Sequence, residues 1–538
     1  MVIRQKNYKL RLITVLIVFF LLFLIIGVRL YLVQIHKQNF FKNLAAQQYS
    51  AEVTVLPSRA LIYDRNGKQL TINTEAQSAF ILPQQLKDKK TKKILKKHYK
   101  QAYKRLKKNP ATKFLWLARK LSKDETKKIT KYKSEDIHFI EEPARHYPYR
   151  YLSPLLGFTD IDNNGLAGIE LQYNEQLNGT STKYLIEKDA RPGTFYFEKS
   201  IKKLGAQGEP VKLTIDNTLQ FLAYDELKKT IKEYEALSGA AVVMNPDTGE
   251  ILAMASYPSF NPNKKNLNDP AKTKNISITE CYEPGSIIKA FSTLSAFEEK
   301  VVEYDEEIDC EGKIAFIDGF RVENWKSIDV CPFWEVVQRS SNVGMAKVAK
   351  RLGTKFYDHL KQLGFGNKTG IEFPGERDGF VNHPINWSRP TLLVLSFGYE
   401  INGTVLQLAK AFSVIANGGY DVKPTLLKKN AAKKLTKKLY NDESIKLTKN
   451  VLETIGQKRQ IPNYRVMGKT GTARCVKDGK YTNKEHVYFY GGIVEKDDYK
   501  RVVVVFVNRP KKSYLYAHQV TGPLFKRIAE KVIIRETV

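Results

Sequence analysis

Residues 282–291 have the sequence YEPGSIIKAF, and this stretch decides how the rest of the chain is interpreted. Pro284 and Gly285 precede an apolar-periodic segment, which predicts a helix with Ser286 in its first turn. Ser286 and Lys289 are three residues apart, so their side chains lie on one face of that helix. A lysine with a lowered pKa could there accept the serine proton while the hydroxyl attacks a carbonyl. The stretch therefore predicts a serine nucleophile with its base.

Two further segments show that the spacing of Ser286 and Lys289 is not a chance match. Ser340 and Asn342 stand in RSSNVG, residues 339–344, and Lys469 opens KTGTA, residues 469–473. Each segment alone suits a structural role, as a helix cap or as a surface strand with a turn glycine. Together, in the order SxxK, SxN and KTG, they are the signature of penicillin-binding proteins and serine β-lactamases.

The chain contains a second Lys-Thr-Gly, at residues 368–370. It follows GFG at 364–366 and precedes IEFPGE at 371–376, which predicts a turn within a loop. We therefore assign the catalytic role to Lys469. Small residues suit the strand around Lys469 because substrate is expected to lie along its backbone: Gly468, Gly471 and Ala473.

Two hairpins predict the fold of the C-terminal half. Residues 240–244 and 250–255 are apolar runs joined by NPDTG, and residues 487–494 and 501–508 flank a polar turn in a second hairpin that closes the chain. With one strand near residue 470 and helical patterns between the hairpins, we predict a central antiparallel sheet flanked by helices, an α+β domain. We place this domain at 211–538.

The N-terminus predicts a membrane anchor. Residues 12–33 are apolar with few exceptions, which is about the length that spans a bilayer. Four basic residues precede this run, so residues 1–11 are expected in the cytoplasm and the rest of the chain outside it. A cleaved signal peptide is the alternative, but the run is long and no small-x-small cleavage site follows. We predict a single-pass protein.

Residues 34–210 predict an elongated domain rich in loops and strands, with a tight turn at Asp64–Gly67. The net charge of +32 is mostly lysine and is clustered, most densely in residues 87–108. We interpret this stretch as an amphipathic basic helix within an insertion of about 87–135. Its basic face is either simply solvated or in contact with anionic lipid or glycan, and we expect no nucleic-acid partner.

The cysteines and histidines indicate no metal site. Four cysteines follow the anchor and are either free or paired in one of three ways: Cys281, Cys310, Cys331 and Cys475. The histidines form no metal-ligand spacing, and we predict neither a metal nor another cofactor.

Nearly the whole chain resembles the class B penicillin-binding proteins, most closely the cell-division transpeptidases of the FtsI type. Residues 59–67 resemble that family's R-G-x-I-x-D-R-N-G segment, and residues 145–148 and 165–170 resemble its pedestal motif. Segments at 396–399, 407–409 and 416–419 also match in type and order. Two positions depart from the family pattern, since Ala60 and Glu400 stand where glycine is expected.

The resemblance implies a role for each site residue. Ser286 would be acylated by the penultimate D-alanine carbonyl of a peptidoglycan stem peptide, with Lys289 as general base. Ser340 would relay a proton to the leaving amine, and Asn342 would hold the substrate amide. The KTG strand would bind the terminal carboxylate through Lys469, Thr470 and Thr472, and Gly471 would keep its backbone open. The backbone N–H groups of Ser286 and Thr472 would form the oxyanion hole.

The resemblance also implies partners and a location. We expect stem peptides ending in D-Ala-D-Ala, inhibition by β-lactams, an FtsW-type polymerase and other division proteins as partners, and a catalytic domain outside the inner membrane. Three alternatives remain: an elongation-type class B transpeptidase, a β-lactam sensor, and a non-catalytic scaffold. A sensor is expected to have several membrane helices, and a scaffold would not label with penicillin.

Overall fold

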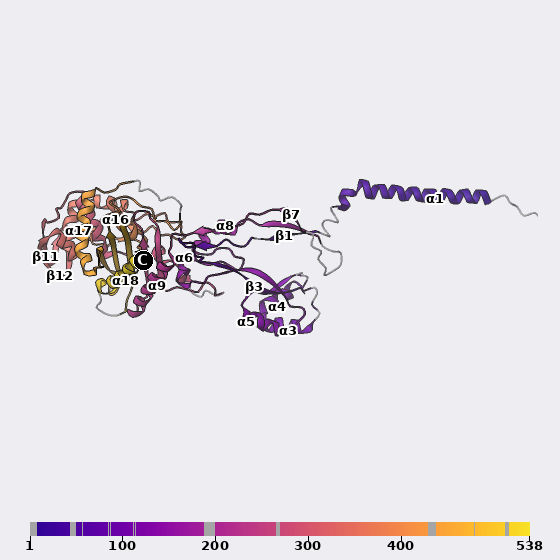
Figure 1. Ribbon diagram of the computed structural model, residues 1–538, viewed down its shortest axis with the longest axis horizontal. Coiled ribbons are helices and arrows are strands. Elements are labelled where there is room, and N and C mark those ends of the chain that lie inside the picture. Colours follow the sequence, from indigo (N-terminus) through magenta and orange to yellow (C-terminus); the bar gives the residue numbers. More distant parts are fainter. Residues whose placement is uncertain are drawn as a thin grey trace, which may run out of the picture. The chain divides into compact units, whose positions relative to one another are not determined.

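The computed structural model describes residues 8–42, 50–55, 57–83, 86, 88–110, 112, 114–187, 199–264, 270–428, 437–477, 479–511 and 516–537. The chain forms two compact units (Figure 1). The first joins residues 1–58 to residues 178–208, and the second joins residues 59–177 to residues 209–538.

The first unit contains an apolar helix and a small sheet. Helix α1 (Tyr8–Tyr31) continues as a π-helical turn, η1 (Leu32–His36). The whole of Tyr8–His36, which includes the predicted span 12–33, is long and apolar enough to cross a membrane. Residues 1–7 of the predicted cytoplasmic segment lie outside the described residues. Strands β1 (Ser50–Val55), β6 (Thr182–Glu187) and β7 (Lys199–Lys203) form an antiparallel sheet in the order β1-β6-β7.

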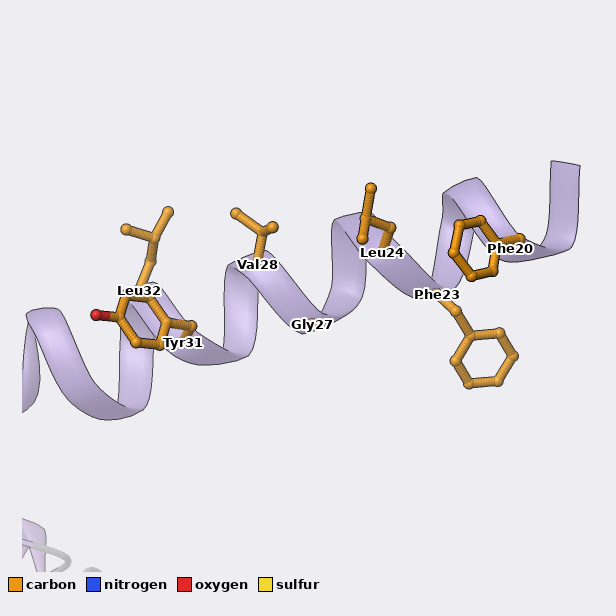
Figure 2. Close-up of a pocket in the computed structure, with 7 residues that line it drawn as sticks. All are labelled: Phe20, Phe23, Leu24, Gly27, Val28, Tyr31 and Leu32. Atoms are coloured by element: carbon orange, nitrogen blue, oxygen red, sulfur yellow. The ribbon is translucent and has the colours of Figure 1, made fainter. Parts of the chain in front are cut away.

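A shallow groove runs along α1, and Figure 2 shows the residues that line it. The lining side chains are apolar except for the Tyr31 hydroxyl, and Gly27 supplies no side chain, which leaves the groove open between its neighbours. Such a surface suits lipid or another apolar helix and provides no catalytic group.

A five-stranded antiparallel sheet organises the second unit, and its strand order is β10-β9-β17-β16-β15. The predicted hairpins are confirmed, as is the strand near residue 470. The bounds are β9 (Ser238–Met244), β10 (Ile251–Tyr257), β15 (Arg465–Lys477), β16 (Lys480–Lys496) and β17 (Tyr499–Asn508).

Helices cover both faces of this sheet, which confirms the predicted fold class. On one face, Val503 and Val505 pack in a cluster with α9 (Asn217–Glu233) and α18 (Ala517–Thr537). On the other face, Val502 and Val504 pack in a cluster with α16 (Val405–Ala416). Successive strand residues point to opposite faces, so a strand covered on both sides is apolar on both, as β17 is from Val502 to Val507.

The sequence predicted that the second hairpin is the last element of the chain. This prediction is wrong, because α18 follows the hairpin. Pro523 lies inside this helix and is a strong local signal against one. Tertiary burial outweighs that signal: Leu524, Phe525 and Ile528 are all at most 1% exposed against the sheet.

The remaining elements of the second unit connect the sheet to the site. The helices and helical turns are η4 (Pro270–Thr273), α10 (Ile276–Thr279), η5 (Gly285–Ile288), α11 (Lys289–Glu298), α12 (Phe333–Gln338), α13 (Asn342–Leu352), α14 (Lys355–Gln362), η6 (Pro384–Asn386), α15 (Thr391–Leu395), α17 (Asp442–Gly456) and η7 (Gln457–Arg459). The strands pair as β11 (Glu307–Ile317) with β12 (Phe320–Pro332), β13 (Phe380–Val381) with β14 (Ile401–Asn402), and β2 (Ile62–Tyr63) with β8 (Val211–Lys212).

Residues 72–146 form a separate layer of sheet and helices, which we call the basic module. Its sheet has the order β4-β3-β5, and its helices are α3, α4 and α5. The bounds are β3 (Ile72–Ile81), α3 (Lys89–His98), α4 (Lys100–Lys108), β4 (Leu115–Leu121), α5 (Lys123–Thr130) and β5 (His138–His146). The predicted single helix over 87–108 is wrong, since the chain breaks at Tyr99 (φ −127°, ψ 56°). The insertion is also not wholly helical, because it contains β4.

A buried ion network joins the segments that carry the family resemblance. The Arg59 guanidinium donates to Glu170 at 2.6 Å and the Arg145 guanidinium donates to the same carboxylate at 2.8 Å, with all three side chains at most 2% exposed. The predicted turn at Asp64–Gly67 is present, with the Gly67 N–H donating to the Asp64 carbonyl. Short helical segments surround this network: η3 (Arg150–Leu152), α6 (Ser153–Leu156), α7 (Gly168–Gln172) and α8 (Asn174–Asn178).

Candidate active site

Ser286 lies in the 3-10 turn η5, which leads directly into α11. The preceding Gly285 has φ +57°, and a Cβ there would lie 2.3 Å from the Thr472 carbonyl oxygen. Only glycine therefore allows the turn that carries Ser286 to approach β15 this closely. The sequence had placed Ser286 in the first turn of the helix, and the structure places it one turn earlier.

Lys289 is fully buried and faces the SxN segment. Its Nζ lies 2.8 Å from the Ser340 carbonyl and 2.7 Å from the Asn342 Oδ1, to which it can donate, and 3.2 Å from the Ser340 hydroxyl, which can donate to the lone pair of a neutral amine. Within the described residues these are its hydrogen bonds, and Ser286 is not among them. Catalytic hydrogen bonds often tighten only when substrate is bound, so this geometry is compatible with proton transfer from Ser286.

Ser340 connects the two lysines of the site. The Lys469 Nζ donates to the Ser340 hydroxyl at 3.1 Å, and the Lys289 Nζ lies 3.2 Å from the same hydroxyl. Ser340 has φ +60°, a strained conformation for a residue with a side chain. The following Ser341 caps α13 by accepting from the Gly344 N–H at 3.0 Å, which fixes the turn that holds Ser340.

The surroundings of both lysines favour their neutral forms. Burial, and after it the neighbouring Lys469, hold the pKa of Lys289 well below its ordinary value. Burial lowers the pKa of Lys469 to about 7. A lysine that is neutral near physiological pH can accept a proton, which an exposed lysine cannot do.

A cleft of about 700 Å³ opens over these groups. Its lining contains six of the predicted site residues: Ser286, Ser340, Asn342, Lys469, Thr470 and Thr472. Lys289 lies buried against this wall. Gly471 is not part of the lining: a Cβ there would lie 2.5 Å from the Pro284 carbonyl oxygen, so its small size serves packing against the turn that carries Ser286.

The second Lys-Thr-Gly lies elsewhere, in a loop. The Thr369 N–H donates to the Glu376 carboxylate at 2.7 Å and its hydroxyl donates to the same oxygen at 2.5 Å. Lys368 is exposed. Hydrogen bonds to Glu376 hold this segment as a loop, whereas Lys469 lies within strand β15.

Sequence reasoning missed Asn324, which supports the SxN segment from β12. Its Oδ1 accepts from the Asn342 N–H at 2.8 Å, the Val343 N–H at 3.2 Å and the Ser341 hydroxyl at 3.0 Å, and the side chain is fully buried. No local pattern marks an asparagine in a strand as such a support, since its partners lie about 18 positions later in the sequence. It also missed the aromatic and basic residues of the cleft wall: Trp325, Lys326, Arg339, Lys458, Arg459 and Tyr516.

Two further sequence observations have a structural outcome. Glu400, which stands where the family has glycine, has φ +56°, so the position does require the left-handed conformation that glycine favours. The four cysteines are free thiols, which leaves none of the three pairings in place. The described residues contain no group of side chains that could hold a metal ion.

Comparison with known proteins supplies the family. Residues 239–530 match the family model of the penicillin-binding protein transpeptidase domain, and residues 54–213 match that of the penicillin-binding protein dimerisation domain. The chain belongs to the class B penicillin-binding proteins.

Relatives along nearly the whole chain support this assignment. The probable peptidoglycan D,D-transpeptidase PbpC of Pseudomonas aeruginosa is 31% identical, over 98% of this chain and 94% of its own. Stage V sporulation protein D of Bacillus subtilis is 33% identical, over 96% and 84%. The peptidoglycan D,D-transpeptidase FtsI of Escherichia coli is 29% identical, over 92% and 86%. This penicillin-binding protein is thus a serine-type peptidoglycan D,D-transpeptidase.

The fold agrees with solved structures of this family. Penicillin-binding protein 3 of Mycobacterium tuberculosis, solved with aztreonam, superposes with a TM-score of 0.69 over 90% of this chain and 98% of that one, at 23% identity. The sheet with helices on both faces is therefore the fold of a penicillin-binding protein.

Proposed function

We propose that this transpeptidase acts through an acyl-enzyme on Ser286, activated by the pair of buried lysines. The observation that supports this most strongly is that Lys289 and Lys469 both lie within hydrogen-bond distance of the Ser340 hydroxyl, which lines the same cleft as Ser286. A serine near a neutral lysine that can accept its proton is what nucleophilic acyl transfer needs, and Lys289 is that lysine in the proposed mechanism.

In the proposed first step, the Ser286 hydroxyl attacks the carbonyl of the penultimate D-alanine of a stem peptide. Lys289 accepts the hydroxyl proton, and the backbone N–H groups of Ser286 and Thr472 stabilise the oxyanion. Ser340 passes its proton to the leaving amine and is reprotonated by Lys289, so the terminal D-alanine leaves as a neutral amine and Lys289 is again neutral. An ester on Ser286 remains.

In the second step, an amine of a neighbouring stem attacks this ester and takes over the acyl group, which regenerates the serine hydroxyl and cross-links two stems. Asn342 holds the substrate amide during both steps. Lys469, Thr470 and Thr472 bind the terminal carboxylate. All of these side chains except Lys289 line the same cleft, which supports the assignment.

β-Lactams are the proposed inhibitors, because they acylate the same serine and the resulting ester does not turn over. The structural relative solved with aztreonam supports this proposal for the present chain.

We further propose that the protein works in septal wall synthesis at the inner membrane, anchored once by α1, with an FtsW-type polymerase and other division proteins as partners. The relative named FtsI supports the division role. An elongation role is the alternative. The proposed domains are the anchor at 12–33, a pedestal at 34–210 and the transpeptidase domain at 211–538.

The test is release of D-alanine from a stem pentapeptide and transfer of the remaining acyl group to an acceptor amine. We expect both activities in the wild type and neither in Ser286→Ala. Depletion in cells distinguishes the roles: filaments with unfinished septa support division, and rounded cells support elongation.

A further inference from the structure

The basic module concentrates positive charge that the catalytic cleft does not use. Residues 88–137 contain 19 Lys and Arg against five Asp and Glu, a net charge of +14 in a chain whose total is +32. Sixteen of these cations are exposed: Lys89, Lys90, Lys92, Lys93, Lys96, Lys97, Lys100, Lys104, Arg105, Lys107, Lys108, Lys123, Lys127, Lys128, Lys131 and Lys133.

Within the part of the chain that the structure describes, these cations form no ion pair with an acidic side chain. Among the ion pairs of the described residues, none includes any of the sixteen. Two of the five acids of this stretch cap helices: Asp88 caps α3 by accepting from the Lys90 N–H at 2.7 Å, and Glu125 completes a capping box with Ser122. By contrast, lysines of the transpeptidase region often pair, as Lys347 does with Glu311.

The apolar sides of the helices are already used. Leu95 and Ala102 are buried in the cluster that also contains Leu115 and Ile129, and Tyr99 packs against the same cluster. The helices therefore have no free apolar face to insert into a bilayer, and any partner must be recognised by charge.

The arrangement is unfavourable in the isolated protein. Lysines four residues apart repel each other along α3 (Lys89 with Lys93, Lys92 with Lys96, Lys93 with Lys97) and α4 (Lys100 with Lys104, Lys104 with Lys108). An anionic surface would relieve this repulsion and release its own counterions.

We propose that the basic module is a docking surface for an anionic membrane, which it binds through lipid headgroup phosphates and without insertion. The cations come from three helices and the turn after α5, so they are spread over the module, which suits a layer of mobile headgroups better than a single ligand. The proposal rests on the proposed anchoring through α1, since a tethered chain meets the membrane surface at high effective concentration and many weak contacts then suffice.

The experiment uses the full-length protein in nanodiscs of phosphatidylcholine alone or mixed with phosphatidylglycerol. Lysines are acetylated under single-hit conditions and quantified by peptide mass spectrometry. We expect the lysines of the basic module to react several-fold more slowly in the anionic discs at low salt, and this protection to vanish at high salt. Six exposed lysines outside the module serve as internal controls and should react equally in both discs: Lys232, Lys300, Lys313, Lys368, Lys423 and Lys446.

Two matched variants sharpen the result. The first variant replaces six module lysines by glutamine: Lys92, Lys93, Lys96, Lys97, Lys100 and Lys104. It should abolish the protection of the module lysines that remain. Replacing the six control lysines by glutamine should leave the protection intact. Penicillin labelling should persist in both variants, so failure of the docking proposal is separable from failure of the catalytic one.

Equal acetylation in both kinds of disc would overturn the proposal, as would protection that survives high salt. Protection that appears only when a soluble poly(glycerol phosphate) is added to zwitterionic discs would assign the surface to an anionic polymer and overturn the lipid assignment.

Discussion

The basic module and the catalytic cleft use lysine in opposite surroundings. The lysines of α3 and α4 are exposed and crowded by like charges, whereas Lys289 and Lys469 are at most 1% exposed and share the hydroxyl of Ser340. Burial lowers the pKa of both cleft lysines, and an exposed lysine stays charged. A high density of exposed lysines therefore marks the region of strong positive electrostatic potential. Burial of a lysine marks the position where it can take part in proton transfer.

The largest expected effect comes from removing the buried base. Lys289→Met should slow acylation by penicillin by about 10²–10⁴-fold, the usual contribution of a general base. Lys289→Arg should fail as well, because arginine does not release its proton. The rate of labelling by a fluorescent penicillin measures this, with Lys368→Met as the exposed control. A loss of only a few-fold would remove Lys289 from the proton transfer.

A smaller loss is expected at the support of the SxN segment. Asn324→Ala leaves three donors without their acceptor, which costs about 1–3 kcal/mol and corresponds to roughly tenfold to hundredfold slower acylation. Asn324→Asp keeps an acceptor oxygen and should recover part of the rate. The exposed Asn386→Ala is the control. Equal rates for Asn324→Ala and wild type would show that the segment holds its shape without this side chain.

The buried lysines should also make stability depend on pH. The folded pKa of Lys469 is about 7, against 10.5 for the ordinary side chain, so between these values the unfolded chain binds a proton that the folded chain does not. The free energy of unfolding should therefore rise with pH across this window, by up to about 1.4 kcal/mol per pH unit for each such lysine.

Thermal unfolding of wild type and Lys469→Met measures this. The variant should be the more stable near neutral pH, by about 1–4 kcal/mol, and its advantage should shrink as the pH is raised toward 10. Lys368→Met should show no such trend. An advantage that grows with pH would contradict the lowered pKa.

The smallest effect is expected on the exposed side of the comparison. Lys96→Gln removes repulsion from Lys92 and Lys93 and should raise stability by about 0.2–0.5 kcal/mol per pair at low salt, with the gain lost at high salt. Unfolding at the two salt concentrations tests this, and Lys300→Gln provides a control with one isolated lysine. Destabilisation by Lys96→Gln would show that the lysine makes a favourable contact.

Much of the catalytic domain could be predicted because its signals are local. Turn residues at 245–249 and 495–498 predict the two hairpins. The order of Ser286, Ser340 and Lys469 predicts acyl transfer on a serine. The burial of Lys289 and Lys469 could not be read in this way, since it depends on helices and strands that are distant in the sequence. Asn324 was missed for the same reason.

The errors arose where tertiary packing outweighs local pattern. The helix after the second hairpin was not predicted: Pro523 lies inside α18, yet the apolar face of this helix is buried against the sheet. The periodicity of residues 87–108 is helical throughout, but the chain turns at Tyr99 so that Leu95 and Ala102 reach the same core cluster. A periodic pattern specifies the face that is buried and leaves open where the chain bends.

Labelling of the full-length protein with a fluorescent penicillin tests the central claim most directly, in wild type, Ser286→Ala, Lys469→Ala and Lys368→Ala. The account predicts strong labelling of wild type and Lys368→Ala and none of Ser286→Ala or Lys469→Ala. A folded wild-type protein that does not label, or a Ser286→Ala variant that still does, would contradict it.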